Sequence, residues 1–172
     1  MNKDIARVIS SIRRNKNRYG ADPILFMTNG KTQITDGARL LRTEEAGFDP
    51  ETDRELYKTA SWFEPIMYDG EIIETPTYKE LREKRDEEKL KYRMKTGKRS
   101  CDKRVVYRFK NGYTLNIDYL MDGIKATGST KFVYSGNRKP CLFKSENQKT
   151  DYLLCPINNA TGETTEGVYL ID

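Results

Sequence analysis

The sequence contains no histidine, and its three cysteines are widely spaced and form no CxxC pair. Histidine is the commonest general base, and histidine and clustered cysteine are the usual ligands of zinc. We therefore expect no metal site, no cofactor and no Cys–His catalytic pair. An odd, scattered set of cysteines also argues against a disulfide framework, so we expect free thiols at Cys101, Cys141 and Cys155.

Long hydrophobic runs are missing as well. No segment approaches the roughly 18 consecutive apolar residues of a membrane helix, and the opening stretch MNKDIARVIS has no hydrophobic signal core. We therefore expect no membrane partner and a cytoplasmic protein. TNGK at 28–31 lacks the length and the Lys-Ser/Thr ending of a phosphate-binding loop, and no paired acids stand out. With no candidate catalytic residues, the sequence favours a protein that is not an enzyme.

The length and composition predict one domain with a modest core. The chain has 172 residues, of which 36% are hydrophobic and 33% charged, so part of the charge must lie on excursions from the core. The net charge of +5 suits a polyanionic partner such as nucleic acid. The distribution of charge along the chain decides more than the total does.

Residues 3–18 have the spacing of an amphipathic helix. Ile5, Val8, Ile9 and Ile12 recur at i, i+3, i+4 and i+7 and predict a buried face. The opposite face gathers Lys3, Arg7, Ser10, Arg14 and Arg18. Such a stripe is commonly just a solvated surface, but it contains no acid, and this favours the alternative of phosphate contact.

Short strands and tight turns follow this helix and recur later in the chain. Asn29-Gly30 predicts a hairpin, and Asp36-Gly37 predicts a turn before a strand over 38–42. From 103 onward we expect a hairpin about Asn111-Gly112, then a helix over 119–127 capped by Asp118 and ended by Gly128. The runs KFVYS, CLFKS and YLLCPI then predict three strands. The chain therefore resembles two half-units, 1–45 and 103–158, that each place a helix before antiparallel strands.

A charged excursion over about 46–102 separates the half-units. We expect a short helix after Asp49-Pro50, a small hairpin about Asp69-Gly70 and a protruding helix over 77–99. The end of the excursion is the strongest basic block of the chain, with one acid, Asp102, among Lys89, Lys91, Arg93, Lys95, Lys98, Arg99, Lys103 and Arg104. Two interpretations remain open, a solvated helix end and a phosphate-contacting surface. The extension over 159–172 favours an edge strand over a docking peptide.

Two motifs, in order, resemble the sliding-clamp family, the beta subunit of bacterial replicative DNA polymerase. The stretch TLNIDYLMDGIK, followed by YLLCPI, is similar to the short helix and final strand of the clamp domain, and TQITDGARLLRT is similar to its Thr-Asp-Gly-x-Arg-Leu segment. The resemblance implies an α+β fold, a single DNA-clamp-like domain of two helix-plus-antiparallel-strand half-units with a charged helical insertion. Departures occur at Ala38, Cys155 and Asn158, where the family often has His, Met and Arg.

The resemblance also implies binding residues. In clamps, paired helices surround duplex DNA and touch phosphates without reading sequence. The positions implied here are Lys3, Arg7, Arg14, Arg18 and Lys125. Clamps also hold short peptides of other replication proteins, and the matching positions here are Thr35, Gly37, Arg39, Leu40, Leu153, Cys155, Pro156 and Ile157. Ordinary sheet packing is the alternative for these apolar residues. Because the family's pocket walls belong to adjacent domains, we expect a pocket only across an interface between copies.

Three functional hypotheses follow. The first is a small clamp-like DNA-replication accessory that binds duplex DNA as a homo-oligomer, with the reduced size suggesting a phage or mobile-element origin. The second is a clamp-like inhibitor or decoy that binds a replication or defence protein without binding DNA. The third is an enzyme on an unrelated α+β scaffold. Salt-dependent, sequence-independent DNA binding discriminates the first from the second.

Overall fold

The structure is a computed structural model, and it describes residues 2–15, 24–28, 31–45, 69–158 and 165–171. The helix expected after Asp49-Pro50, the first arm of the hairpin expected about Asp69-Gly70, and Arg18 lie outside the described residues. In the part described, no helix is both long and apolar enough to cross a membrane.

The first helix, α1, runs over Lys3–Arg13 and buries the face that the sequence predicts. Ile5, Val8, Ile9 and Ile12 are all buried. The Asn2 side chain accepts a hydrogen bond from the Asp4 backbone N–H at 3.0 Å, which caps the first turn. The helix ends earlier than expected, because Arg14 is already its C-cap.

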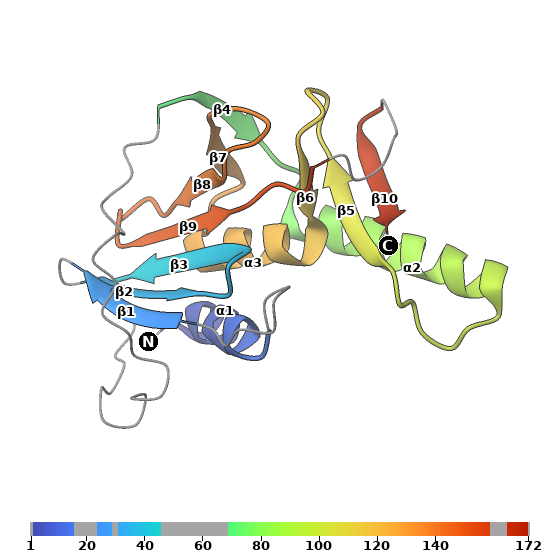
Figure 1. Cartoon of the computed structure of the whole chain (residues 1–172), viewed down its shortest axis with the longest axis horizontal. Helices are drawn as coiled ribbons and strands as arrows, with labels where there is room; N and C mark the ends of the chain where they lie inside the picture. The colour runs from blue at the N-terminus through green and yellow to red at the C-terminus, as the bar shows by residue number, and fades with distance from the viewer. Residues whose placement is uncertain (1, 16–23, 29–30, 46–68, 159–164, 172) are drawn as a thin grey trace.

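A large antiparallel sheet joins the two half-units. Its strands lie in the order β1-β2-β3-β9-β8-β7-β4 (Figure 1). The strands of the first half-unit meet those of the second at the β3–β9 pair, where Leu41 lies opposite Tyr152. Their bounds are β1 Ile24–Thr28, β2 Lys31–Thr35, β3 Arg39–Thr43, β4 Glu71–Glu74, β7 Lys131–Tyr134, β8 Cys141–Lys144 and β9 Thr150–Leu154. The two half-units are therefore a single α+β domain and not two independent ones.

A smaller sheet has the order β10-β5-β6, with β5 Arg104–Arg108, β6 Thr114–Asn116 and β10 Gly167–Ile171. The turn expected at Asn111-Gly112 joins β5 to β6, and Gly112 has a φ of 85°, a conformation that favours glycine. Strand β10 pairs antiparallel with β5 and lies at the edge of this sheet. The prediction of an edge strand in the C-terminal extension is confirmed.

Helix α3 spans Ile117–Thr127 and follows β6 without a loop. Its N-cap is Asn116 and not Asp118 as expected, because the Asn116 side chain accepts from the backbone N–H groups of Asp118 and Tyr119. Asp118 lies instead in the first turn, where its charge suits the helix dipole. Gly128 ends the helix with a φ of 69°, as expected.

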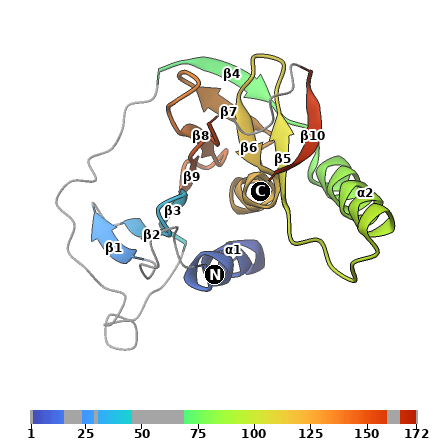
Figure 2. The same cartoon turned by 45° about the vertical axis from the view of Figure 1, so that its right-hand side comes forward.

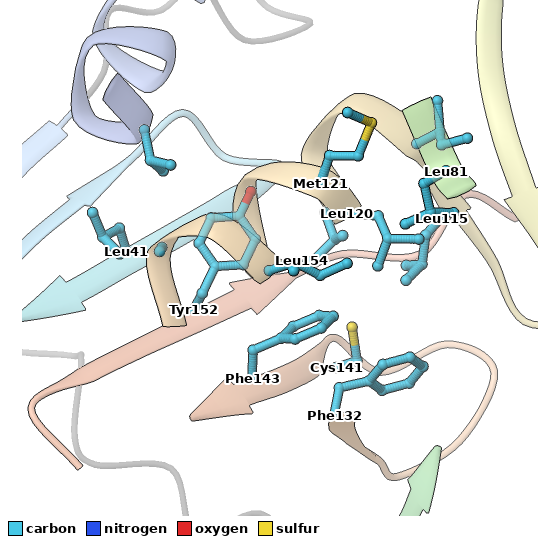
Figure 3. Packing of buried hydrophobic residues seen from close by; sticks show 14 of the residues in the cluster. Leu41, Leu81, Leu115, Leu120, Met121, Phe132, Cys141, Phe143, Tyr152 and Leu154 are labelled. Atoms are coloured by element: carbon cyan, nitrogen blue, oxygen red, sulfur yellow. The ribbon is translucent and has the colours of Figure 1, made fainter. Parts of the chain in front are cut away.

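A row of large side chains crosses the helix-facing side of the large sheet. Residues directly opposite on antiparallel strands project to the same face, and the register places Ile34, Leu41, Tyr152, Phe143 and Phe132 in one row. All five are at most 1% exposed. The aromatic members lie close to one another and beneath α3 (Figure 3), with ring centroids 5.2 Å apart for Phe132 and Phe143. This row is the centre of the hydrophobic core.

The excursion is built into the domain at two places. Strand β4 pairs with β7, so the segment after Gly70 extends the large sheet. The hairpin expected about Asp69-Gly70 stays a prediction, because its first arm lies outside the described residues. Helix α2, Tyr78–Thr96, begins with a capping box between Thr77 and Glu80. It contacts α3, β5 and β10, and its Leu81 is buried. In the layer of helices, α3 therefore lies between α1 and α2 (Figures 1 and 2).

The glycine inside α3 is explained by the aromatic row beneath it. A Cβ atom at Gly123 would lie 2.8 Å from Cδ1 of Tyr152 and 3.4 Å from Cδ2 of Phe143. Both rings are fully buried, so a larger residue at position 123 would have to displace core side chains. The helix therefore approaches the sheet as closely as only glycine permits.

We expect Gly123→Ala to lower the free energy of unfolding by about 1 to 2 kcal/mol, because overpacking of the core outweighs alanine's higher helix propensity. Chemical denaturation followed by circular dichroism measures this. Ser10→Ala, on the exposed face of α1, is the control and should change stability by less than about 0.5 kcal/mol. A Gly123→Ala protein as stable as the wild type would contradict the close approach.

Candidate functional site

The basic stripe of α1 faces solvent. Lys3, Arg7 and Arg14 are all exposed on the side of the helix opposite the buried isoleucines. Arg7 lies 3.4 Å from the Asp4 carboxylate, but both groups are largely exposed, and such a pair contributes little. The Arg14 Nε donates to the Ser10 carbonyl oxygen at 3.1 Å. The structure thus brings three of the predicted phosphate-contacting residues together on one helix.

Lys125 has a different setting from the α1 stripe. It is half-buried on α3, and its ammonium lies 4.5 Å from the centroid of the Tyr78 ring on α2. A cation over an aromatic face is held by the ring's quadrupole. Lys125 therefore lies beside α2, while the other described cations of the predicted set lie on α1.

A buried ionic cluster, which the sequence analysis did not anticipate, ties both helices to the sheet. Arg39 at the start of β3 is its centre: its Nε donates to Asp36 at 2.9 Å, another of its nitrogens contacts Asp122 on α3, and a third donates to the Ser11 hydroxyl at 3.1 Å. The guanidinium also lies 4.0 Å from the centroid of the Tyr119 ring. We call Ser11, Asp36, Arg39, Tyr119 and Asp122 the Arg39 cluster.

The charges of the Arg39 cluster are paired, and those of Arg39 and Asp36 are shielded from water. The side chains of Arg39 and Asp36 are 1% and 0% exposed. Burial by itself would lower the pKa of Arg39, but the nearby acidic groups raise that pKa above its usual value, so the guanidinium stays charged. Burial raises the pKa of the Asp122 carboxyl, and the charge of Arg39 opposes this shift. The cluster is a structural anchor that joins the turn before β3 to α1 and α3.

The turn before β3 positions the side chains of Asp36 and Arg39 for the Arg39 cluster. Asp36 accepts hydrogen bonds from the backbone N–H groups of Ala38 and Arg39, both at 3.1 Å, and Gly37 has a φ of 84°. Asn15, just after α1, donates to the same Asp36 carboxylate at 2.9 Å. The Thr-Asp-Gly-x-Arg pattern is thus a local turn that presents a carboxylate and a guanidinium to the helices. The spacing of Asp36 and Arg39 was the one sequence signal for this cluster. It could not indicate their partner Asp122, which is 83 residues from Arg39.

The predicted peptide-binding residues have mixed positions. Arg39 is directed inward and is committed to its cluster, so its side chain is not open to an external peptide in this structure. Leu40 and Leu153 are opposite each other on β3 and β9 and project away from the helices, Leu40 buried and Leu153 half-buried. Thr35 pairs with Leu40 across β2 and β3.

The remaining predicted residues gather at the end of the β3–β9 pair. Gly37 is exposed in its turn, and the Cys155 backbone N–H donates to the Ala38 carbonyl oxygen at 2.9 Å. Pro156 and Ile157 are half-buried, and Ile157 bonds to the Thr114 backbone at 2.9 Å. The two motifs therefore adjoin within one chain, and a peptide pocket across an interface between copies stays a prediction.

Among the described residues, no group of three potential metal-ligating side chains is found. The three cysteines are free thiols, with Cys141 buried. Burial raises the pKa of the Cys141 thiol to about 12, which keeps it protonated and unreactive near neutral pH.

Comparisons with known proteins find similarities among solved structures only. No family model matches the sequence, and no curated protein matches it. Among solved structures, the chain resembles sliding clamps. A putative DNA polymerase III beta subunit from Eubacterium rectale has a TM-score of 0.48 at 15% identity, over 91% of this chain and 63% of that one. A Pseudomonas aeruginosa sliding clamp has a TM-score of 0.47 at 14% identity, over 90% of this chain and 63% of that one.

These clamp-like similarities describe the arrangement of helices and strands only. In both cases the match covers less than two thirds of the other chain's length. What this chain binds, and how many copies assemble, must be argued from its own residues.

We expect Arg39→Met to lower the free energy of unfolding by about 3 to 5 kcal/mol, because it leaves the Asp36 and Asp122 carboxylates without their buried partner. Chemical denaturation at neutral pH measures the loss.

Arg42→Met is the matched control, since Arg42 pairs with Asp151 on the opposite face of the sheet, where Lys31 also lies 3.9 Å from that carboxylate. Arg42 is more exposed than Arg39, so we expect a smaller loss of about 1 to 2 kcal/mol. Equal losses from the two substitutions would argue against the special role of the Arg39 cluster.

Proposed function

We propose that the protein is a non-enzymatic, clamp-like accessory of DNA replication that binds duplex DNA independently of sequence. The observation that carries the proposal is the exposed stripe of Lys3, Arg7 and Arg14 on a helix that is anchored rigidly to a continuous sheet. Cations that touch phosphates position a protein on DNA but read no bases. Sliding along DNA requires a rigid basic surface that contacts phosphates and does not recognise bases.

The sheet supports the second part of this proposal, assembly of several copies. The large sheet ends in β1 on one side and β4 on the other, and both are edge strands in the part of the chain that is described. Edge strands carry unpaired backbone groups that another chain can pair with. Contacts between β1 of one copy and β4 of the next would be head-to-tail and would close into a ring or continue as a filament.

The second candidate function, an inhibitor or decoy that binds a replication or defence protein, is favoured by one observation. Leu90 and Met94 are 48% and 78% exposed on α2, and their i, i+4 spacing puts them on one side of that helix. Exposed apolar residues of this kind suit a protein partner better than DNA. Tight binding to a protein combined with no DNA affinity would favour this function.

The DNA-binding proposal is tested by fluorescence anisotropy with labelled duplexes of unrelated sequence. We expect similar affinities for each duplex and a steep decrease with salt, because each phosphate contact contributes a slope of about −0.9 in log K against log salt. Arg7→Ala with Arg14→Ala should reduce that slope by about 2 × 0.9.

Arg138→Ala with Lys144→Ala is the matched control, because it removes the same charge from exposed positions near β8, away from the helices. We expect this pair to leave the salt slope nearly unchanged. Failure of the wild-type protein to bind any duplex would reject the proposal, as would equal effects of the two double variants.

Assembly is tested by the mass in solution. We expect light scattering coupled to size-exclusion chromatography to give the mass of several chains, with the fraction of assembled protein rising with concentration. A strict monomer at the highest soluble concentration would rule out a ring made of this chain alone, but would leave the DNA-binding proposal standing.

A further inference from the structure

The C-terminal half of α2 and the segment after it carry positive charge that the protein does not neutralise. In the first half of α2, cations pair with acids along the helix, as in Lys79 with Glu83 at 3.9 Å and Arg82 with Asp86 at 3.8 Å. Between residues 92 and 104 the sequence has a single acid, Asp102, which pairs with Lys98. Within the described parts of the chain, no ion pair joins an acid to Arg93, Lys95, Arg99 or Arg104.

Part of this charge lines a hollow. The hollow has a volume of ≈ 310 Å³, near the lower end of the range for ligand sites. It is lined by Asp86, Lys89, Arg93, Arg99, Ser100 and Cys101. The first three are spaced i, i+3 and i+7 and so lie along one side of α2. The last three come from the segment beyond the end of the helix.

The local structure explains how the two walls meet. Helix α2 ends at Gly97, whose φ of 69° reverses the chain direction. The returning segment is pinned by Asp102, which accepts hydrogen bonds from the Tyr92 hydroxyl at 2.6 Å and from the Lys98 ammonium at 2.8 Å. Residues 99–101 are thereby held beside the last turns of the helix. The hollow is therefore formed by the described fold and needs no outside partner to assemble.

The chemistry of the lining suits a phosphate group. The single acid, Asp86, is already paired with Arg85 at 2.8 Å, and Lys89 is only loosely paired with Asp118 at 3.8 Å. Two guanidinium groups remain, and their planar forks bind phosphate oxygens in pairs. The Ser100 hydroxyl adds a neutral donor. Favourable charge at a helix C-terminus explains Arg93 but not Arg99, which lies beyond the helix end.

We propose that this hollow binds a backbone phosphate of duplex DNA, with Arg93 and Arg99 contacting the phosphate oxygens and Ser100 donating a hydrogen bond. The choice of DNA as the source of the phosphate rests on the proposed function. It is supported by Lys95 and Arg104, which extend the unpaired charge beyond the hollow and suit a chain of phosphates better than a single one. The α1 stripe and the hollow lie on helices on either side of α3, so one duplex across the helix layer would have two points of contact (Figure 2).

Cys101 provides a site-specific readout because it lines the hollow. The experiment measures the rate of alkylation of Cys101 by N-ethylmaleimide, by peptide mass spectrometry, with Cys155 as the internal reference. Rates are compared with and without a labelled duplex, and with and without inorganic pyrophosphate, for the full-length protein. The salt slope of duplex binding is measured on the same samples.

In the wild type we expect the duplex to slow alkylation of Cys101 several-fold and to leave Cys155 unaffected. Arg93→Ala with Arg99→Ala should abolish this protection and reduce the salt slope by about 0.9, because one phosphate of the duplex is no longer neutralised. Lys95→Ala with Arg104→Ala removes the same charge from the same region but not from the lining, and should keep the protection. Circular dichroism confirms that both double variants retain their helices.

Two results would overturn the site while leaving the DNA-binding proposal intact: duplex binding without protection of Cys101, or protection that survives removal of both arginines. If the wild type binds no duplex, DNA is rejected both as the occupant and in the proposed function. The pyrophosphate samples then show whether the hollow binds phosphate at all. Protection by pyrophosphate that disappears in Arg93→Ala with Arg99→Ala would retain a phosphate site, and its absence would reject the hollow altogether.

Discussion

The contact between Arg39 and the two carboxylates around it is the constraint on which the helix layer depends. Arg39 starts β3, Asp36 lies in the preceding turn, Asp122 lies on α3 and Ser11 lies on α1. A buried guanidinium needs compensating charge and hydrogen bonds, and here these come from the turn before β3 and from both helices. The position and rotation of both helices on the sheet are therefore coupled to one side chain. This rigidity is what would hold a basic stripe at a constant distance from a ligand.

Close packing beneath α3 adds a second constraint. The row of Leu41, Tyr152, Phe143 and Phe132 crosses the point where the two half-units meet, so neither half-unit has a core of its own. Gly123 lets α3 approach these rings more closely than any other residue would. A short helix with an interior glycine is weak by local propensity. It is stable here because tertiary packing and the Arg39 cluster hold it from two sides.

One part of the charged excursion packs into the domain, and another part extends away from the core. Strand β4 extends the large sheet, and the first half of α2 buries Leu81 and places Arg85 2.7 Å from Asp118 on α3. The second half of α2 leaves the core, and no acid follows Glu88 within the helix. One helix thus has a half that is bound by packing and a half whose charges are available to a partner. The net charge of α2 describes neither half, because Arg93 and Lys95, which have no acidic partner among the described residues, both lie in the second half.

Local patterns in the sequence were sufficient to predict most of the helices and strands. The isoleucine spacing predicted the buried face of α1, glycine-containing turns marked the strands, and Gly128 marked the end of α3, because short-range sterics and backbone hydrogen bonding determine these features. The cap of α3 was misplaced by two residues, since Asn116 and Asp118 are both good caps and only the backbone path out of β6 selects between them.

Only the tertiary structure decided which distant side chains meet. Arg39 and Asp122 are 83 residues apart, and nothing in either segment indicates the other, so a guanidinium expected at a peptide surface is in fact an internal anchor. The pairing of β4 with β7 and the return of residues 99–101 onto α2 are of the same kind. Such contacts arise from the packing of the whole chain. The free-energy cost of burying a charge is offset only when all the partners of that charge are in place.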